Sequence, residues 1–136
     1  MKKYTFSVLI IVLLLSHSVF AGANRLFLDK AGANYLHGLN SDHVSLVEST
    51  IHNVMAFKQQ YPEYNFKPII GKLTDLSLSS ENSTVKLKAF LGLNYIKHTE
   101  WFGIYDFADP ENQDLIFDDI VRKMAIRNKI NFINMK

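Results

Sequence analysis

The segment from residue 42 to residue 61 constrains the fold more than any other part of the chain. Ser41 or Asp42 can accept hydrogen bonds from the free N–H groups of a first helical turn, and Pro62 cannot continue a helix. Between these points the apolar residues repeat at helical spacing. They are Val44, Val47, Ile51, Val54 and Met55. A start signal, an apolar stripe and a stop signal together predict one amphipathic helix.

The same punctuation returns about 40 residues further along the chain. Asn82 and Ser83 can cap a second long helix, which leads to residues 100–102. Each long helix is followed by a segment that opens with a proline, Pro68 or Pro110, and proline is tolerated in a first helical turn. Residue identity between the two halves is low, so spacing carries the argument. Two helix–loop–helix units at this distance match the period of HEAT-type repeats and predict two helical hairpins.

Local patterns predict the remaining helices. Residues 24–37 carry an apolar stripe and end before Gly38, a preferred residue just past a helix C-terminus. Residues 67–78 form a third helix. Residues 109–131 form the last one, with Asp109 as its cap and acids before bases, an order that complements the helix dipole. Its expected core face is Leu115 or Ile116, Ile120, Val121, Met124 and Ala125.

Residues 84–97 fit two structures. From Val85 to Leu91, apolar and basic residues largely alternate, which is typical of a strand. Helical spacing instead relates Val85, Ala89, Leu93 and Ile96. We favour a helix, because every other segment is predicted to be helical, and apolar residues on most of its sides would make it a central, buried one. The expected fold is all-α, with about five helices: two HEAT-like hairpins and an N-terminal capping helix.

These residues resemble a family. The shared stretches are Gly38-Leu39-Asn40-Ser41-Asp42, Val47-Glu48-Ser49, Phe57-Lys58, Tyr61-Pro62, Lys86-Leu87-Lys88-Ala89-Phe90-Leu91 and Glu100-Trp101-Phe102. They resemble small exported bacterial proteins with HEAT-like helical hairpins, over about residues 36–102. Such proteins have no assigned chemistry, so the resemblance implies a fold and a compartment and no activity.

The first 21 residues show the three parts of a cleavable secretory signal peptide. Lys2 and Lys3 supply the positive start, residues 6–15 the apolar run, and residues 19–21 the small-residue cleavage site. Cleavage after Ala23 fits equally well. The apolar run is shorter than the roughly 20 residues that a membrane-spanning helix needs. We therefore expect a periplasmic or secreted protein without a membrane span after cleavage, in which residues 22–136 form a single domain.

Composition excludes several classes of function. The chain has no Cys, which removes thiolate catalysis, thiolate metal ligands and disulfide bonds. Apart from Lys2 and Lys3, basic and acidic residues are equal in number, so the domain lacks the basic surface that nucleic-acid binding requires. The charge is uneven, with six acids in residues 106–119 and five bases in residues 122–136, which we interpret as a helix-end pattern. The acids Asp106, Asp109, Glu111 and Asp114 lack the spacing of a calcium loop.

One polar cluster could support metal or hydrolytic chemistry. Glu48 and His52 are four residues apart on one predicted helix face, and His43 lies about a turn earlier. Such spacing can supply metal ligands, yet it is also common on a solvated face. The chain contains no H-E-x-x-H motif, no Gly-rich phosphate loop and no G-x-S-x-G motif. We therefore expect no catalytic residue, no metal site and no cofactor, and keep a small metal-binding or hydrolytic protein that uses this cluster as an alternative.

Aromatic residues gather in the two predicted hairpin loops. If the hairpins stack in parallel, both loops reach the same end of the molecule. The rings then either anchor each loop to the core, which we favour, or form a hot spot for a partner. Under the second interpretation the contact candidates are Trp101, Tyr105, Phe107, Tyr61 and Tyr64. The sequence thus predicts an exported, non-enzymatic module that binds another protein, with an inhibitor or immunity-like protein as a further alternative.

Overall fold

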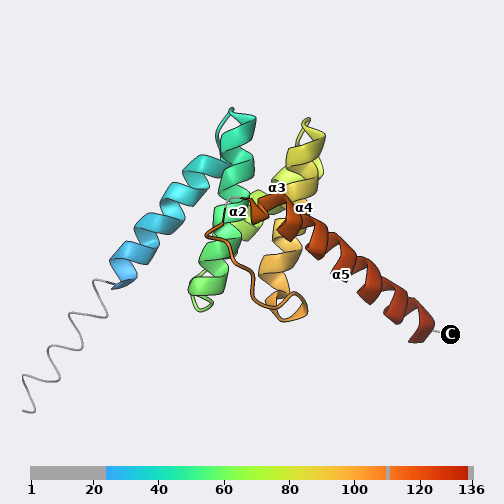
Figure 1. The fold of residues 1–136 in the computed structure, drawn as a ribbon. Helices are drawn as coiled ribbons and strands as arrows, with labels where there is room; N and C mark the ends of the chain where they lie inside the picture. The colour runs from blue at the N-terminus through green and yellow to red at the C-terminus, as the bar shows by residue number, and fades with distance from the viewer. Residues whose placement is uncertain (1–23, 110, 135–136) are drawn as a thin grey trace, which may run out of the picture. The chain divides into compact units, whose positions relative to one another are not determined.

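Every regular element in residues 24–109 and 111–134, the part of the chain that the computed structural model describes, is helical (Figure 1). The elements are a helix over residues 24–39, α2 (Val44–Gln60), α3 (Lys67–Ser79), α4 (Ser83–Lys97), the 3₁₀ turn η1 (Thr99–Trp101) and α5 (Asn112–Asn134). The predicted all-α fold with about five helices is confirmed. The predicted signal peptide, residues 1–21, lies outside the described residues. No helix within the described ranges has the length and apolar character that crossing a membrane requires.

The chain divides into two compact units, Met1–Asn34 and Tyr35–Lys136. The described part of the first unit, residues 24–34, is helical and leaves Leu26 and Phe27 exposed. All contacts described below lie within the second unit.

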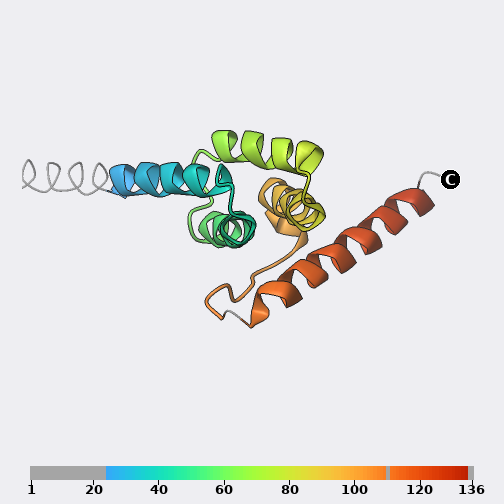
Figure 2. The same ribbon diagram turned by 90° about the horizontal axis from the view of Figure 1, so that it is seen from above.

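α4 occupies the centre of the second unit. It packs against α2, α3, η1 and α5, and Figure 2 shows α2 and α3 on neighbouring sides of it. Its buried residues point in several directions, as predicted for a central helix. They are Val85, Ala89, Leu91, Gly92, Leu93, Tyr95 and Ile96. The strand alternative for residues 85–91 is therefore wrong. Their alternating pattern arises because a helix that is buried on most sides carries apolar residues at many positions, some of which alternate by chance.

Of the two predicted helix caps, the one at α4 is confirmed for Asn82 and the one at α2 is wrong. α4 is capped by Asn82, whose Oδ1 accepts a hydrogen bond from the Val85 N–H at 2.9 Å, so Ser83 is already its first residue. α2 has His43 as its N-cap residue, without a side-chain cap. The Ser41 hydroxyl accepts from the His43 N–H at 3.1 Å and does not reach the first turn of α2. The predicted capping of this helix by Ser41 or Asp42 is wrong.

Gly38 does not end the first helix. The helix continues through residue 39, and Leu39 is buried. A Cβ atom at position 38 would overlap the side chain of Thr50 on α2. Glycine fits there because the Thr50 side chain packs directly against the backbone of residue 38, so the predicted helix stop is wrong.

α5 uses a narrower core face than its sequence predicts. Ile116, Phe117 and Ile120 are buried, whereas Leu115 and Val121 are exposed. Of the remaining expected core residues, Met124 is partly buried and Ala125 is exposed. The helix begins at Asn112, so the predicted cap, Asp109, precedes it and its Oδ1 accepts from the Glu111 N–H at 3.0 Å. Only one side of α5 is covered by the rest of the unit, which leaves the first turns partly open to solvent.

Candidate functional site

The loop after η1 is attached to the end of α2 by one glutamine. Gln59 donates from Nε2 to the Tyr105 carbonyl at 2.9 Å, and its Oε1 accepts from the Tyr105 N–H at 2.9 Å. The same Oε1 accepts from the Tyr95 hydroxyl of α4 at 3.1 Å. Gly103, with φ of 78°, lets the chain turn after η1. The two predicted hairpin loops do reach the same end of the second unit (Figure 1).

A polar network attaches the same loop to α5. The Tyr105 hydroxyl donates to Asp119 Oδ2 at 2.7 Å, and Lys123 Nζ lies 2.8 Å from that oxygen. Arg122 pairs with the other carboxylate oxygen of Asp119. Lys123 also donates to the Phe102 carbonyl. The Asp119 carboxylate on α5 therefore binds two cations and the hydroxyl of the loop tyrosine.

These contacts fix the protonation of the network. Hydrogen bonds from Lys123, Arg122 and Tyr105 hold the pKa of the Asp119 carboxyl well below its usual range. Burial, reinforced by Asp119, raises the pKa of the Tyr105 phenol above its usual range, and burial raises the pKa of Tyr95 to about 12. Asp119 therefore stays ionised and both phenols stay protonated at neutral pH.

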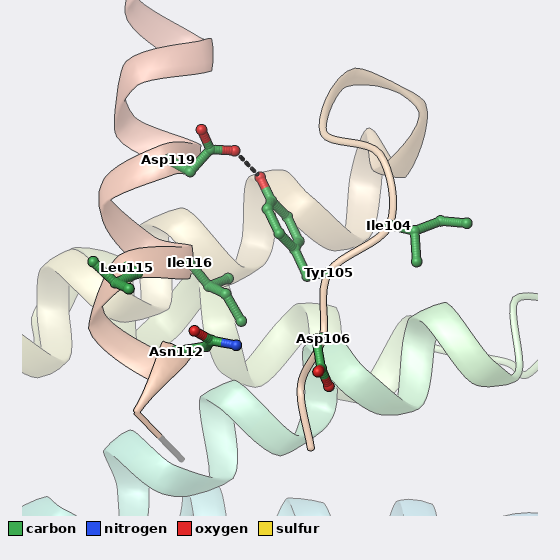
Figure 3. A pocket seen from close by; sticks show the side chains of 7 residues that line it. All are labelled: Ile104, Tyr105, Asp106, Asn112, Leu115, Ile116 and Asp119. Atoms are coloured by element: carbon green, nitrogen blue, oxygen red, sulfur yellow. Dashed lines mark hydrogen bonds between the residues drawn. The ribbon is translucent and has the colours of Figure 1, made fainter. Parts of the chain in front are cut away.

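A groove with a volume of about 270 Å³ lies between the loop and the start of α5 (Figure 3). Its lining residues are Ile104, Tyr105, Asp106, Asn112, Leu115, Ile116 and Asp119. Tyr105 crosses from the loop toward Asp119, and Ile116 points from α5 toward the loop (Figure 3). Ile104 and Leu115 lie on the two outer margins, 90% and 64% exposed. The groove thus has a fixed aromatic and aliphatic centre between two exposed aliphatic side chains.

The candidate contact residues of the first loop pack around α2. Tyr61 and Tyr64 both lie against Phe57, with ring centroids 5.3 Å and 5.0 Å from it. Phe57 and Phe66 are buried in the same aromatic cluster. Rings in this arrangement hold a loop onto a core.

The candidates of the second loop also have contacts inside the unit. Trp101 stacks on His98 with ring centroids 3.8 Å apart, and the Arg127 guanidinium lies 4.2 Å from the Trp101 ring centre. Phe107 meets the edge of His52, and Tyr105 belongs to the polar network. Of the predicted contact residues, only Tyr105 lines the groove. A role in partner contact for the others stays a prediction.

The structure separates the candidate metal ligands. His43 is exposed at the start of α2, whereas His52 is buried at 6% exposure against Phe107. Glu48 pairs with Lys88 of α4 at 2.9 Å. The expectation that Glu48 and His52 share a solvated face is wrong, because α4 and the second loop cover that side of α2. In the described ranges, no three His, Asp or Glu side chains are placed to hold a metal ion together.

The acids once considered for calcium serve the loop backbone. Asp106 Oδ1 accepts from the Ala108 N–H at 3.1 Å, and Asp109 makes the corresponding contact with Glu111. Asp114 lies 3.5 Å from Lys88, with its side chain 88% exposed. Asp106 and Asp109 therefore stabilise turns of the loop that precedes α5 and do not cap the helix itself.

Several residues of the groove escaped the sequence analysis. The spacing of Asp119, Arg122 and Lys123 is a readable signal for pairing within one helix. Gln59 has no local signal, because its partner Tyr105 lies 46 residues away. Leu115 fits the helical stripe as well as Ile116 does, and only the packing decides which of them is buried.

Comparison with known proteins gives this chain no relative. No family model matches it, no curated protein matches it, and no solved structure matches it. The functional argument therefore rests on the groove and the network that holds it open.

Proposed function

We propose that this chain is an exported protein-interaction module without catalytic activity, and that the groove between the second loop and α5 is its docking site. The observation that carries the proposal is the exposure of Ile104 and Leu115 on the two margins of one groove. Large aliphatic side chains beside a hollow keep apolar surface in water, and a docked protein removes that surface from water.

The rigidity of the groove supports this proposal. Gln59 holds the loop from one side and Asp119 holds Tyr105 from the other. A surface that is already ordered loses less conformational entropy when a partner binds, so more of the contact free energy becomes affinity.

The size and chemistry of the groove favour a protein side chain over a small substrate. Its volume of about 270 Å³ falls below the range of roughly 300–1,000 Å³ that encloses a small-molecule ligand. Asp119 and Tyr105, the titratable pair at its centre, are held in one protonation state each at neutral pH. Both points support a binding role over a hydrolytic one.

The helix order supports a HEAT-like relationship as part of the proposal. The order α2–loop–α3 and α4–loop–α5 is that of two helix–loop–helix units, although α2 and α3 both pack mainly against α4. Stacked units of this kind commonly present binding surfaces. The exported address rests on the signal-like pattern of residues 1–21. An inhibitor or immunity-like protein is the special case in which the docked partner is an enzyme.

A crosslinking pull-down with tagged full-length protein tests the proposal. The variants Ile104→Asp and Leu115→Asp place a charge on each margin, and Leu87→Asp places one on an exposed position of α4 away from the groove. We expect wild type and Leu87→Asp to recover the same partner, and both groove variants to lose it while keeping a helical circular dichroism spectrum. Equal recovery by all four proteins, or no recovery by any, would contradict the proposal.

A further inference from the structure

The charge on the loop and the start of α5 is mainly negative, and the cations beside the groove are Arg122 and Lys123, which contact Asp119. Residues 103–121 contain six acidic residues and no Lys or Arg. Asp119 is neutralised by Arg122 and Lys123. The five others are exposed. They are Asp106, Asp109, Glu111, Asp114 and Asp118.

The neighbouring cations are already engaged. Lys123 binds Asp119 and the Phe102 carbonyl, and Lys88 binds Glu48 at 2.9 Å. Arg122 pairs with Asp119. Lys88 also lies 3.5 Å from Asp114, whereas the other exposed acids pair with none of these three cations. The exposed acids form an acidic fringe on the loop and the start of α5, of which Asp106 lines the groove.

We infer that the groove binds a segment of another protein in which one apolar side chain is flanked by Lys or Arg. This inference deepens the proposed function and rests on it. The apolar side chain packs over Tyr105 and Ile116 and covers the margins formed by Ile104 and Leu115. The flanking cations lie within reach of the acidic fringe, which attracts them during the encounter and rejects acidic segments.

The same charges argue against other occupants. An acidic segment or a phosphate-rich surface would be repelled by the acidic fringe beside the groove. A purely apolar segment would fill the centre but bring no cation to the exposed acids, and would gain nothing in specificity from them. A basic segment with one apolar side chain complements both the apolar centre and the acidic fringe.

Fluorescence anisotropy with defined peptides tests the inference. The probe is a short labelled peptide with a central Leu flanked by Lys on both sides, and the matched peptides carry Ser in place of Leu or Glu in place of Lys. We expect the first peptide to bind intact protein at least about tenfold more tightly than either matched peptide. Its affinity should also fall as ionic strength rises from about 0.05 M to 0.5 M, because salt screens exposed charges.

Matched variants locate the effect. Neutralising Asp106 and Asp118 together (Asp106→Asn with Asp118→Asn) should lower the affinity for the Lys-flanked peptide about tenfold. Glu81 is an exposed acid in the α3–α4 connection, and Glu81→Gln should leave this affinity unchanged. Equal binding of the Glu-flanked peptide, or a doubly neutralised variant that binds as wild type does, would overturn the inference. So would a groove-dependent dimer in sedimentation, since a second copy would then be the occupant. If binding of a partner depended on Ile104 but not on these acids, the proposed function would stand. Only the inference that the bound segment is basic would be refuted.

Discussion

At the scale of single residues, two helical glycines illustrate how packing decides the effect of one methyl group. A Cβ at position 92 would lie 2.8 Å from Ile51 Cγ2, whereas a Cβ at position 71 on α3 would meet nothing within 4 Å. We predict that Gly92→Ala lowers the free energy of unfolding by about 1 kcal/mol or more, because overpacking exceeds the gain in helix propensity. Gly71→Ala should raise it by roughly 0.5–1 kcal/mol. Urea unfolding of both variants measures the two signs, and a stabilised Gly92→Ala protein would contradict the close approach of α2 and α4.

A second prediction at this scale concerns His52. Its Nε2 has no hydrogen-bond partner among the described residues. Burial lowers the pKa of its imidazole below 6.5, with Lys88 adding to the effect and a hydrogen bond with Asn53 opposing it. As the pH falls, His52 takes up a proton in the unfolded chain before it does in the native protein. The contribution of neutral His52 to the free energy of unfolding is therefore complete above pH 6.5 and is lost as the pH falls below it.

The variant His52→Leu tests that sign. We expect its melting temperature to fall less than that of wild type between about pH 7 and pH 5, since no buried group must become charged. His43→Gln, at an exposed position, should retain the wild-type dependence. Identical pH profiles for wild type and His52→Leu would mean that other groups cause the acid sensitivity.

At the scale of the elements, the start of α4 separates two neighbouring polar residues. Asn82 accepts from the Val85 N–H, and Ser83 is an exposed first-turn residue. We predict that Asn82→Ala costs about 1 kcal/mol of stability, because a free N–H group loses its acceptor, and that Ser83→Ala changes stability by less than half of that. Thermal unfolding compares the two. The reverse order would show that Ser83, the other candidate from the sequence, is the cap.

The elements also show which features local sequence predicts. The existence of α2, α3 and α5 follows from apolar spacing and from Pro62, Pro68 and Pro110, all of which act within a few residues. At α4 the adjacent Asn82 and Ser83 compete for one capping position, and only the structure distinguishes them. At α2 the helix starts after His43 without a side-chain cap, so the polar residues before it do not mark its start. Gly38 was misassigned because a helix stop and a close helix contact both require glycine, and only the fold distinguishes them.

At the scale of the whole molecule, the site was less predictable than the fold. The two aromatic loops are readable from the sequence, and Figure 1 shows both reaching the same end of the second unit. The groove itself depends on Gln59 reaching Tyr105 and on Leu115 remaining outside the core, and neither property is encoded in a local pattern. Helices depend on interactions between residues close in the sequence, so an all-helical fold can be predicted from local patterns. A surface formed where distant segments meet cannot be predicted in this way.

The packing of α5 determines whether the second unit unfolds as one body. Ile116, Phe117 and Ile120 are buried, and Arg127 of α5 lies over the ring of Trp101, which stacks on His98 at the end of α4. The chain has a single Trp, so its fluorescence reports on this junction, while far-ultraviolet circular dichroism reports on all helices. We predict that both signals change at the same urea concentration, because the α5 contacts belong to the common core.

The variant Ile120→Ala sharpens this last prediction. It removes a fully buried side chain from α5 and should cost about 2–5 kcal/mol. If α5 belongs to the cooperative unit, the fluorescence and circular dichroism midpoints fall together. A fluorescence midpoint that falls alone would mean that α5 detaches before the other helices unfold. The groove would then exist only while α5 is docked, since four of its seven lining residues lie on α5, and peptide binding should disappear with the fluorescence signal and not with helicity.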